Sequence, residues 1–111
     1  MKPILWCGDS LDRIRDFPEL ARRKVGQQLN RLQHGEEPHD WKPMQAIGLG
    51  VGEIRIHQPG EYRVIFVAKF AESVYVLHAF AKKSRKTARR DLKIAGMRFS
   101  ALVEMRKRQN L

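Results

Sequence analysis

The fold is decided by residues 51–67, which read VGEIRIHQPGEYRVIFV. In the first half of this stretch, Ile54 and Ile56 alternate with charged residues, and this period of two predicts a strand with one polar face. The second half is apolar on both faces except at Arg63, as in a central strand. The Pro-Gly pair at 59–60 predicts the turn that joins them. Because this connection is far too short for a crossover, we predict an antiparallel hairpin.

Two further elements are expected toward the C-terminus. Residues 74–80 read VYVLHAF and predict a third strand. Thr87 is a plausible cap for a last helix, expected from about Ala88 to Arg108. Apolar residues at helical spacing give this helix an inward stripe. The stripe consists of Leu92, Ala95, Phe99, Leu102 and Met105.

Toward the N-terminus, the sequence predicts a short strand and a first helix. Residues 4–7 read ILWC, an apolar run suited to a strand. Asp9 and Ser10 offer side-chain oxygens that could cap the helix that follows. The expected buried face of this helix carries Leu11, Ile14 and Phe17.

A second helix completes the expected elements. It is predicted to begin at Pro18, which suits a first helical turn, and to stop at Gly35, before a polar loop over 35–43. Residues 1–111 are therefore predicted to form one α+β domain. We expect an N-terminal helical hairpin packed on a small twisted, mainly antiparallel sheet of about four strands, with a basic C-terminal helix.

Composition restricts the class of protein. No apolar run approaches the roughly 20 residues of a membrane-spanning helix, and the first six residues are too short and mixed for a signal peptide. We therefore expect a cytoplasmic protein. Cys7 is the only cysteine, so no internal disulfide can form. Its apolar surroundings favour a buried structural thiol over a nucleophile.

The positive charge is concentrated near the C-terminus. The net charge is +10, and residues 82–111 carry 11 Lys or Arg against 2 Asp or Glu. Such a basic segment could be a solvated helix face or a surface for a polyanion.

Three segments together resemble the phage-derived Gp49-like family, a branch of the RelE toxin superfamily related to the HigB toxins. They are Glu53–Arg55, Tyr62–Val67 and the run LHAFAKKSRKT over 77–87. The resemblance implies the toxin of a type II toxin–antitoxin system, with a helix-turn-helix antitoxin encoded by a neighbouring gene. It also implies a ribosome-dependent endoribonuclease that cleaves messenger RNA on the concave face of the sheet. Two residues depart from the family pattern: Ala88, where members often carry Pro, and Gly96, which interrupts the last helix.

Cleavage of RNA without a metal uses the substrate's own 2′-hydroxyl as nucleophile, so charge must be stabilised on phosphorus and two protons must move. No set of His, Cys, Asp or Glu has convincing metal-ligand spacing, and we expect neither a metal nor another cofactor. Arg55 is a candidate for stabilising the phosphate, with an exposed ion pair to Glu53 or Glu61 as the alternative. Arg63, alone in an apolar strand, needs either a phosphate or a carboxylate.

The cationic run after the third strand supplies further candidates. Lys82 and Lys83 could transfer protons, because neighbouring cations lower a lysine pKa, or could simply hold a phosphate. We expect the cations that follow to grip ribosomal RNA. They are Arg85, Lys86, Arg89 and Arg90.

Two histidines and one aromatic residue remain. His78 suits proton transfer, although a hydrogen-bonded core histidine is the stronger expectation, and alternation puts it on the face of Val76 and Phe80. His57 lies on the Arg55 face and is a reserve candidate. Phe80 could stack on an unpaired base or belong to the core.

A different class of function fits the same charge. The chain could be a non-enzymatic, phage-derived regulatory protein that binds nucleic acid or the ribosome. RNA fragments with 5′-hydroxyl ends, produced only in the presence of ribosomes, would separate an enzyme from such a binding protein.

Overall fold

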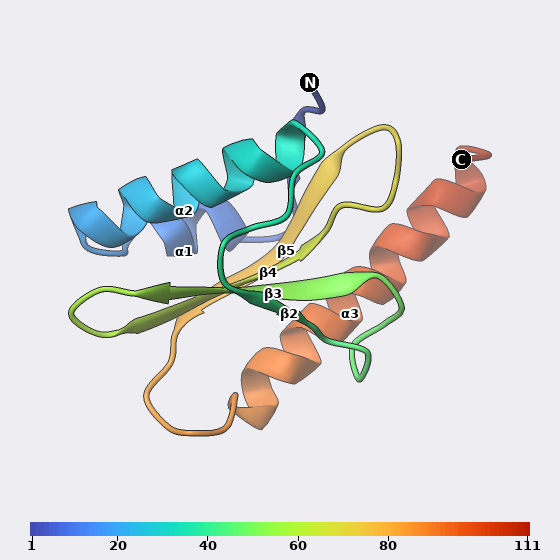
Figure 1. The fold of residues 1–111 in the computed structure, drawn as a ribbon. Helices are drawn as coiled ribbons and strands as arrows, with labels where there is room; N and C mark the ends of the chain where they lie inside the picture. The colour runs from blue at the N-terminus through green and yellow to red at the C-terminus, as the bar shows by residue number, and fades with distance from the viewer.

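The computed structural model describes residues 1–111 and shows an α+β fold (Figure 1). One five-stranded mixed sheet has the strand order β1-β5-β4-β3-β2. The strands are β1 (Ile4–Trp6), β2 (Trp41–Pro43), β3 (Val51–His57), β4 (Glu61–Val67) and β5 (Val74–Ala81). The helices are α1 (Ser10–Arg15), α2 (Glu19–Gln33) and α3 (Arg89–Arg108). None of the three helices combines the length and the hydrophobicity that a membrane-spanning helix requires.

The predicted hairpin is confirmed. β3 and β4 pair antiparallel, with Arg55 opposite Arg63 and His57 opposite Glu61. β5 then pairs antiparallel with β4, which makes β4 the central strand. The alternation of residues 51–57 and the apolar character of 61–67 thus predicted the middle of the sheet.

The edges of the sheet differ from the prediction of about four strands. Residues 41–43, expected in a polar loop, form β2 and pair antiparallel with β3. β1 pairs parallel with β5, so the sheet is mixed. Along the chain, α1 and α2 lie between β1 and the other strands. This long connection allows β1 to pair parallel with β5.

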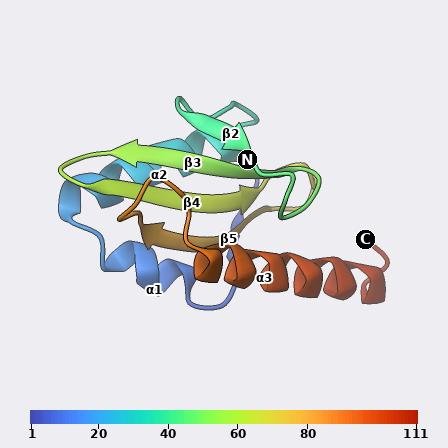
Figure 2. The ribbon, with the colours of Figure 1, turned by 90° about the horizontal axis from the view of Figure 1, so that it is seen from below.

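The helices cover both faces of the sheet. α1 and α2 lie on one face and α3 crosses the other, as Figures 1 and 2 show from two directions. Two cores result. On the α1/α2 side, Val25 and Leu29 pack with Ile54 and Val64. On the α3 side, Leu102 belongs to a second core built around the sheet residues Val51, Ile65, Val67 and Leu77.

The N-terminal helices depart from a regular hairpin. α1 has only 6 residues and packs mainly against β5 rather than α2. Phe17 lies beyond the end of α1 but is buried, and its ring centroid is 4.7 Å from that of Tyr62. Gly35 ends α2 as expected: its φ of +79° allows the amide of Glu36 to donate to the carbonyl of Arg31.

The expected side-chain caps are absent from α1 and α3. Asp9 precedes α1 without capping it, because its carboxylate binds the side chains of Arg13 and Arg98 instead. Ser10 is buried and donates to the carbonyl of Val76, which ties α1 to β5. Thr87 does not cap α3: its hydroxyl donates to the carboxylate of Glu53, and Ala88 occupies the cap position.

A β-bulge in β5 changes the face on which His78 lies. Ile65 pairs with His78 but Phe66 pairs with Val76, so Leu77 is an extra residue. Val76 therefore packs with the α1/α2 core, whereas His78 faces α3 and shares that side with Phe80. The expectation that Val76 and His78 share a face was wrong for this reason.

Candidate nucleic-acid and catalytic site

A row of three side chains crosses the α3 side of the sheet. Arg55 of β3 pairs with Arg63 of β4, and Arg63 pairs with Phe80 of β5. The adjacent row consists of Glu53, Ile65 and His78. Two cations directly opposite each other in a sheet repel, so this arrangement needs an anion nearby.

Two carboxylates compensate the arginine pair in the unbound protein. Glu61 accepts a hydrogen bond of 3.1 Å from Arg63 Nη2. Glu53 Oε1 lies 3.8 Å from Arg55 Nε and 3.7 Å from Arg63 Nε. The side chain of Arg55 is 34% exposed, whereas that of Arg63 is only 6% exposed. Arg55 can therefore contact a ligand directly, and Arg63 supports it from below.

The cations after β5 form a loop beside this row. Residues 82–88 run on the α3 side of the sheet, below the β3–β4 hairpin (Figures 1 and 2). The amide of Lys82 donates to the carbonyl of Glu61, which fixes the start of the loop. A hollow of about 380 Å³ opens between loop and sheet, and we call it the basic hollow. Its lining residues are Glu61, Arg63, Lys82, Lys83, Ser84 and Arg85.

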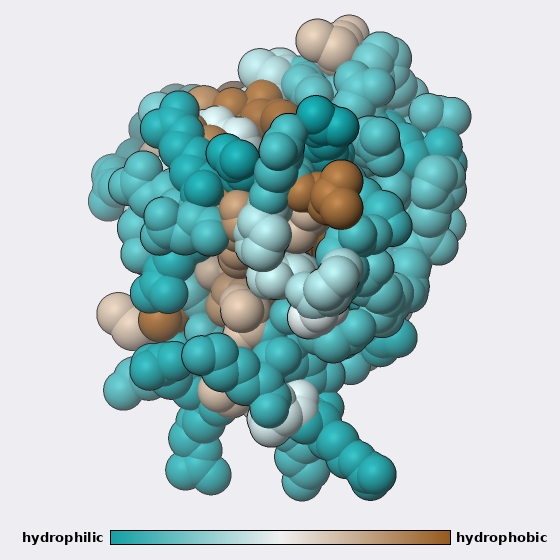
Figure 3. Space-filling view, turned by 90° about the vertical axis from the view of Figure 1, so that its left-hand side faces the viewer, coloured by the Kyte–Doolittle hydropathy of each residue, from teal (hydrophilic) through white to brown (hydrophobic).

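The surface at this end of the molecule is strongly hydrophilic. Figure 3 shows long hydrophilic side chains that extend from its lower edge, where Figure 1 places the loop. Lys83, Arg85 and Lys86 are exposed. A phosphate backbone could therefore reach several cations at once.

Arg89 and Arg90 continue this basic surface onto α3. Both are exposed and occupy the first turn of the helix. The partial positive charge of a helix N-terminus disfavours cations by about 0.3–1 kcal/mol. A bound phosphate would relieve this repulsion and would also interact favourably with the helix terminus.

His78 is a core residue in this structure. Its side chain has no exposed surface, and Nε2 lies 2.8 Å from Oδ1 of Asp91 in the first turn of α3. Arg98 Nη1 lies 3.4 Å from Nδ1. Burial lowers the pKa of His78, against the opposing effect of the hydrogen bond to Asp91. His78 thus lies where RNA cannot touch it, and its expected part in proton transfer has no geometric support.

Phe80 is also largely inside the protein. It is 5% exposed, and its ring stacks on that of His78 at a centroid distance of 5.3 Å. Little of the ring is left to stack on a base.

His57, the reserve candidate, is exposed and lies between two carboxylates. Its Nδ1 is 2.8 Å from Glu61 Oε1, and its Nε2 is 2.6 Å from Asp40 Oδ2. The hydrogen bond to Glu61, followed by that to Asp40, raises the pKa of His57. His57 and Arg55 line one shared hollow at the outer end of β3. A raised pKa favours the protonated form of this histidine, which is the form that can act as an acid.

Three acidic residues of the site were not among the expected site residues. Glu61 lines the basic hollow, Glu53 lies between the two arginines, and Asp91 holds His78. The register of the hairpin places Glu61 opposite His57, so the sequence could have indicated Glu61 as a site residue. Alternation puts Glu53 on the Arg55 face, although it does not indicate burial. The pairing of Asp91 with His78 depends on how α3 packs and left no signal in the sequence.

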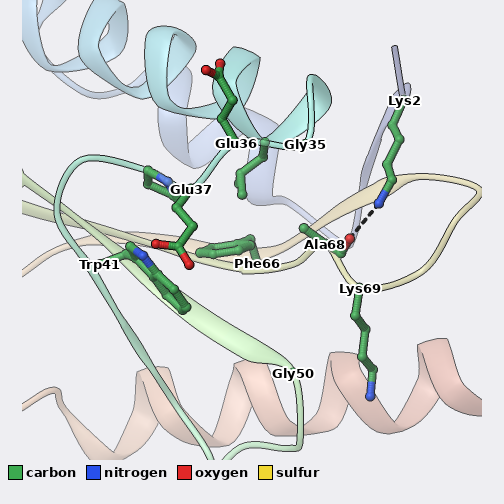
Figure 4. Close-up of a pocket in the computed structure, with 11 residues that line it drawn as sticks. Lys2, Gly35, Glu36, Glu37, Trp41, Gly50, Phe66, Ala68 and Lys69 are labelled. Carbon is green, nitrogen blue, oxygen red and sulfur yellow. Dashed lines mark hydrogen bonds between the residues drawn. The ribbon is translucent and has the colours of Figure 1, made fainter.

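Another pocket, of about 250 Å³, lies on the α2 side of the sheet (Figure 4). The Glu37 carboxylate points toward Trp41 and Phe66, while Lys2 donates to the carbonyl of Ala68. Lys69 turns away and donates to the carbonyl of Leu49. None of the expected site residues lines this pocket, so it is separate from the basic hollow.

Comparison with known families identifies the chain's relatives. The sequence matches the family described as Phage derived protein Gp49-like (DUF891) over residues 12–100. A search of curated proteins found no match. The family match spans β2 to β5, both arginines and most of α3. The chain therefore belongs to the phage-derived Gp49-like family, which is part of the RelE/HigB-type toxin group.

Proposed function

We propose that this protein is the toxin of a type II toxin–antitoxin system and a ribosome-dependent endoribonuclease that cleaves messenger RNA without a metal. The observation that carries the proposal is the cross-strand pair Arg55 and Arg63 beside a loop of four cations. Membership of a toxin family supports it. Ribosomes and messenger RNA would be its partners in the cytoplasm.

Arg55 is assigned to the scissile phosphate. Its planar guanidinium matches a phosphate in two hydrogen bonds, and its side chain is 34% exposed. Arg63 adds positive charge from beneath, where low exposure strengthens its effect. Together they would stabilise the extra negative charge that develops when the 2′-hydroxyl attacks phosphorus.

Proton transfer is assigned to the lysines of the basic hollow and to His57, which lines the separate hollow that it shares with Arg55. Lys82 or Lys83 could accept the proton of the 2′-hydroxyl or could hold the phosphate, and both roles stay open. His57 is the stronger histidine candidate for protonating the departing 5′-oxygen, because it is exposed and its pKa is raised. His78, with Asp91, would position the strand that carries Phe80 rather than meet RNA.

Binding of ribosomal RNA is assigned to the exposed cations at the rim of the basic hollow and beyond it. Arg85, Lys86, Arg89 and Arg90 follow one another from the loop into the start of α3. Such a line of cations suits a phosphate backbone, which carries no sequence information by itself.

A helix-turn-helix antitoxin is the second expected partner. It could block the site by covering the basic hollow or by pairing with an exposed edge of the sheet, where β1 and β2 are the edge strands. A complex that leaves Arg55 and Lys82 open, with undiminished cleavage, would contradict this assignment.

The alternative function is a non-enzymatic protein that binds nucleic acid or the ribosome. One observation favours it: both arginines already have carboxylate partners in the unbound protein. A protein that only binds would need the basic surface but no proton transfer.

The two functions are separated by the Arg55→Ala variant. If Arg55 stabilises the transition state, cleavage of messenger RNA on purified ribosomes falls about 100-fold to 1,000-fold, while ribosome binding changes little. Arg22→Ala is the control. It removes the same charge from an exposed position of α2, on the opposite face of the sheet. Equal losses of cleavage and binding would contradict the catalytic assignment of Arg55.

A further inference from the structure

Glu53 is an ionisable side chain with no exposed surface at the centre of the site. Its Oε1 lies within ion-pair distance of three cations: 3.7 Å from Arg63 Nε, 3.8 Å from Arg55 Nε and 4.0 Å from Lys42 Nζ. Yet neither Glu53 Oε1 nor Arg63 Nε has a hydrogen-bond partner. The carboxylate thus acts on several cations by charge and is not committed to one of them by a hydrogen bond.

Burial of a carboxylate requires compensation. Removing a charge from water costs several kcal/mol, and an apolar residue of similar size is often as stable or more stable at such a position. Val51 and Ile65, on the same side of the sheet, show that the neighbouring positions hold apolar residues. Core stability alone therefore gives no reason for a glutamate at residue 53.

The arginine pair gives a reason. Arg55 and Arg63 lie directly opposite each other, where two cations repel. Glu53 is in the adjacent row and faces the Nε atoms of both. It can therefore hold the two guanidinium groups side by side. The outer nitrogens of Arg55 stay available, whereas Arg63 Nη1 and Nη2 donate to the carbonyl of Tyr62 and to the carboxylate of Glu61.

Glu53 also contacts the end of the basic loop. Its second oxygen, Oε2, accepts a hydrogen bond of 3.4 Å from the hydroxyl of Thr87. Thr87 is the last residue but one before α3 and follows Lys86 directly. One carboxylate thus connects the arginine pair of the sheet with the loop that carries the lysines.

We propose that Glu53 is the positioning residue of this site: it sets the spacing of Arg55 and Arg63 and ties the 82–87 loop to the sheet without touching RNA. What the arginines do for the substrate rests on the function proposed above. Glu53 attracts the same guanidinium groups as a phosphate would, so it also weakens their attraction for the substrate. A neutral residue there would bind RNA more tightly and cleave it more slowly.

The Glu53→Gln variant tests this inference, because glutamine keeps the size of the side chain and removes its charge. We expect kcat for ribosome-dependent cleavage to fall about 10-fold to 100-fold, as for a misplaced catalytic group. We expect KM to fall about two- to fivefold, because the arginines gain attraction for phosphate. A purely structural role would lower kcat in proportion to the folded fraction, measured by circular dichroism, and leave KM unchanged.

Two further variants complete the experiment. Glu36→Gln removes the same charge from an exposed position near the end of α2 and should leave both constants unchanged. Glu53→Asp keeps the charge but is too short to reach both contacts, so kcat should fall while KM stays near that of the wild type. If Glu53→Gln fails to fold, the inference is tested by the fall in kcat of Glu53→Asp. An unchanged kcat, or a KM that rises or stays constant in Glu53→Gln, would overturn the inference.

Failure of the proposed function has a different signature. If the wild-type chain does not cleave messenger RNA, that function is contradicted, and the role of Glu53 is then judged from ribosome binding in the same samples. Tighter binding of Glu53→Gln with a steeper salt dependence would support the inference, because the freed arginines would contact phosphate. Binding equal to that of the wild type would overturn it.

Discussion

The site combines cations that repel each other with carboxylates that keep them together. Arg55 and Arg63 are adjacent on neighbouring strands, and Glu53 and Glu61 compensate them in the unbound state. A phosphate that enters the site would meet guanidinium groups already held in place, which reduces the entropy lost on binding. This arrangement explains how Arg55 and Arg63 can lie side by side without a ligand.

Alternation along the strands predicted part of this site. It put Arg55 and Arg63 on strands of one hairpin, and both lie on the α3 side of the sheet. It failed for His78, because a bulge at Leu77 shifts the register and cannot be seen in the sequence. It also could not show that Glu53 is buried, since burial depends on the packing of other elements above the sheet.

His57 and His78 should affect stability with opposite dependence on pH. The pKa of His57 is raised by Glu61 and Asp40, so its stabilising contribution is complete below the unfolded value of about 6.5 and is lost as pH rises through the folded pKa. The advantage of the wild type over His57→Gln in unfolding free energy should therefore shrink as the pH rises above about 6.5. An advantage that grows over this range, measured by urea titration, would contradict the assignment.

The pKa of His78 is lowered by burial, which reverses the sign. The unfolded chain binds a proton at His78 more readily than the folded chain, so stability is lost as pH falls below about 6.5. His78→Gln should be less stable than the wild type by about 1–3 kcal/mol at neutral pH, because Asp91 loses its partner. This difference should shrink toward acidic pH in the same titrations. A difference that widens at acidic pH would show that His78 is charged in the folded state.

At the scale of elements, local patterns predicted the central strands and α3 but not the edges. β3, β4 and β5 are long enough for a period to be visible. β2 has three residues, one of them a proline, and forms only because β3 offers a free edge. The parallel pairing of β1 with β5 joins residues about 70 positions apart, which no local pattern reports.

At the starts of α1 and α3, the side chains expected to cap the helix make tertiary contacts instead. Asp9 binds Arg98 of α3, and Thr87 binds Glu53 of β3. Ser, Thr and Asp at helix starts are good cap candidates, but a partner elsewhere in the fold can take the same oxygen. The sequence pattern around the helix start does not indicate which distant residue will bind that oxygen.

α3 should gain stability from the substitution Gly96→Ala. A Cβ at this position has no heavy atom within 4 Å, and alanine loses less conformational entropy in a helix. The expected gain in unfolding free energy is about 1 kcal/mol. Gly26→Ala in α2 meets equally open space and should give a similar gain.

Gly8→Ala is the opposing control. Gly8 has a φ of +54°, and an added Cβ would lie 2.5 Å from the Arg98 side chain. This variant should be destabilised, because the left-handed conformation strains any other residue. A loss of stability in Gly96→Ala would contradict the open space around this position.

At the scale of the whole molecule, charge is separated along the chain and in space. Nearly all of the excess positive charge follows residue 81, in the loop and in α3. The loop and the start of α3 gather at one end of the sheet, beside the β3–β4 hairpin (Figure 2). The loop and the first turn of α3 can therefore present a basic surface to ribosomal RNA, whereas Arg106, Lys107 and Arg108 lie in the last turn of α3.

Salt dependence tests this orientation. The double variant Arg89→Gln and Arg90→Gln should bind ribosomes more weakly, and the slope of log affinity against log salt should become shallower by about 0.7–0.9 for each lost phosphate contact. Arg22→Gln with Arg23→Gln removes the same charge from exposed positions of α2 and should leave the slope unchanged. Equal changes in both pairs would mean that net charge, not this surface, determines binding.

The most direct test of the central claim is the mapping of messenger RNA 5′ ends in bacteria that express the wild-type chain or its Arg55→Ala, Lys82→Ala, Lys83→Ala variant. We expect arrested growth and cuts phased with the reading frame only for the wild type, with 5′-hydroxyl ends from attack by the 2′-hydroxyl. Soluble expression of the wild type without cuts or growth arrest would contradict the ribonuclease assignment and favour the binding protein.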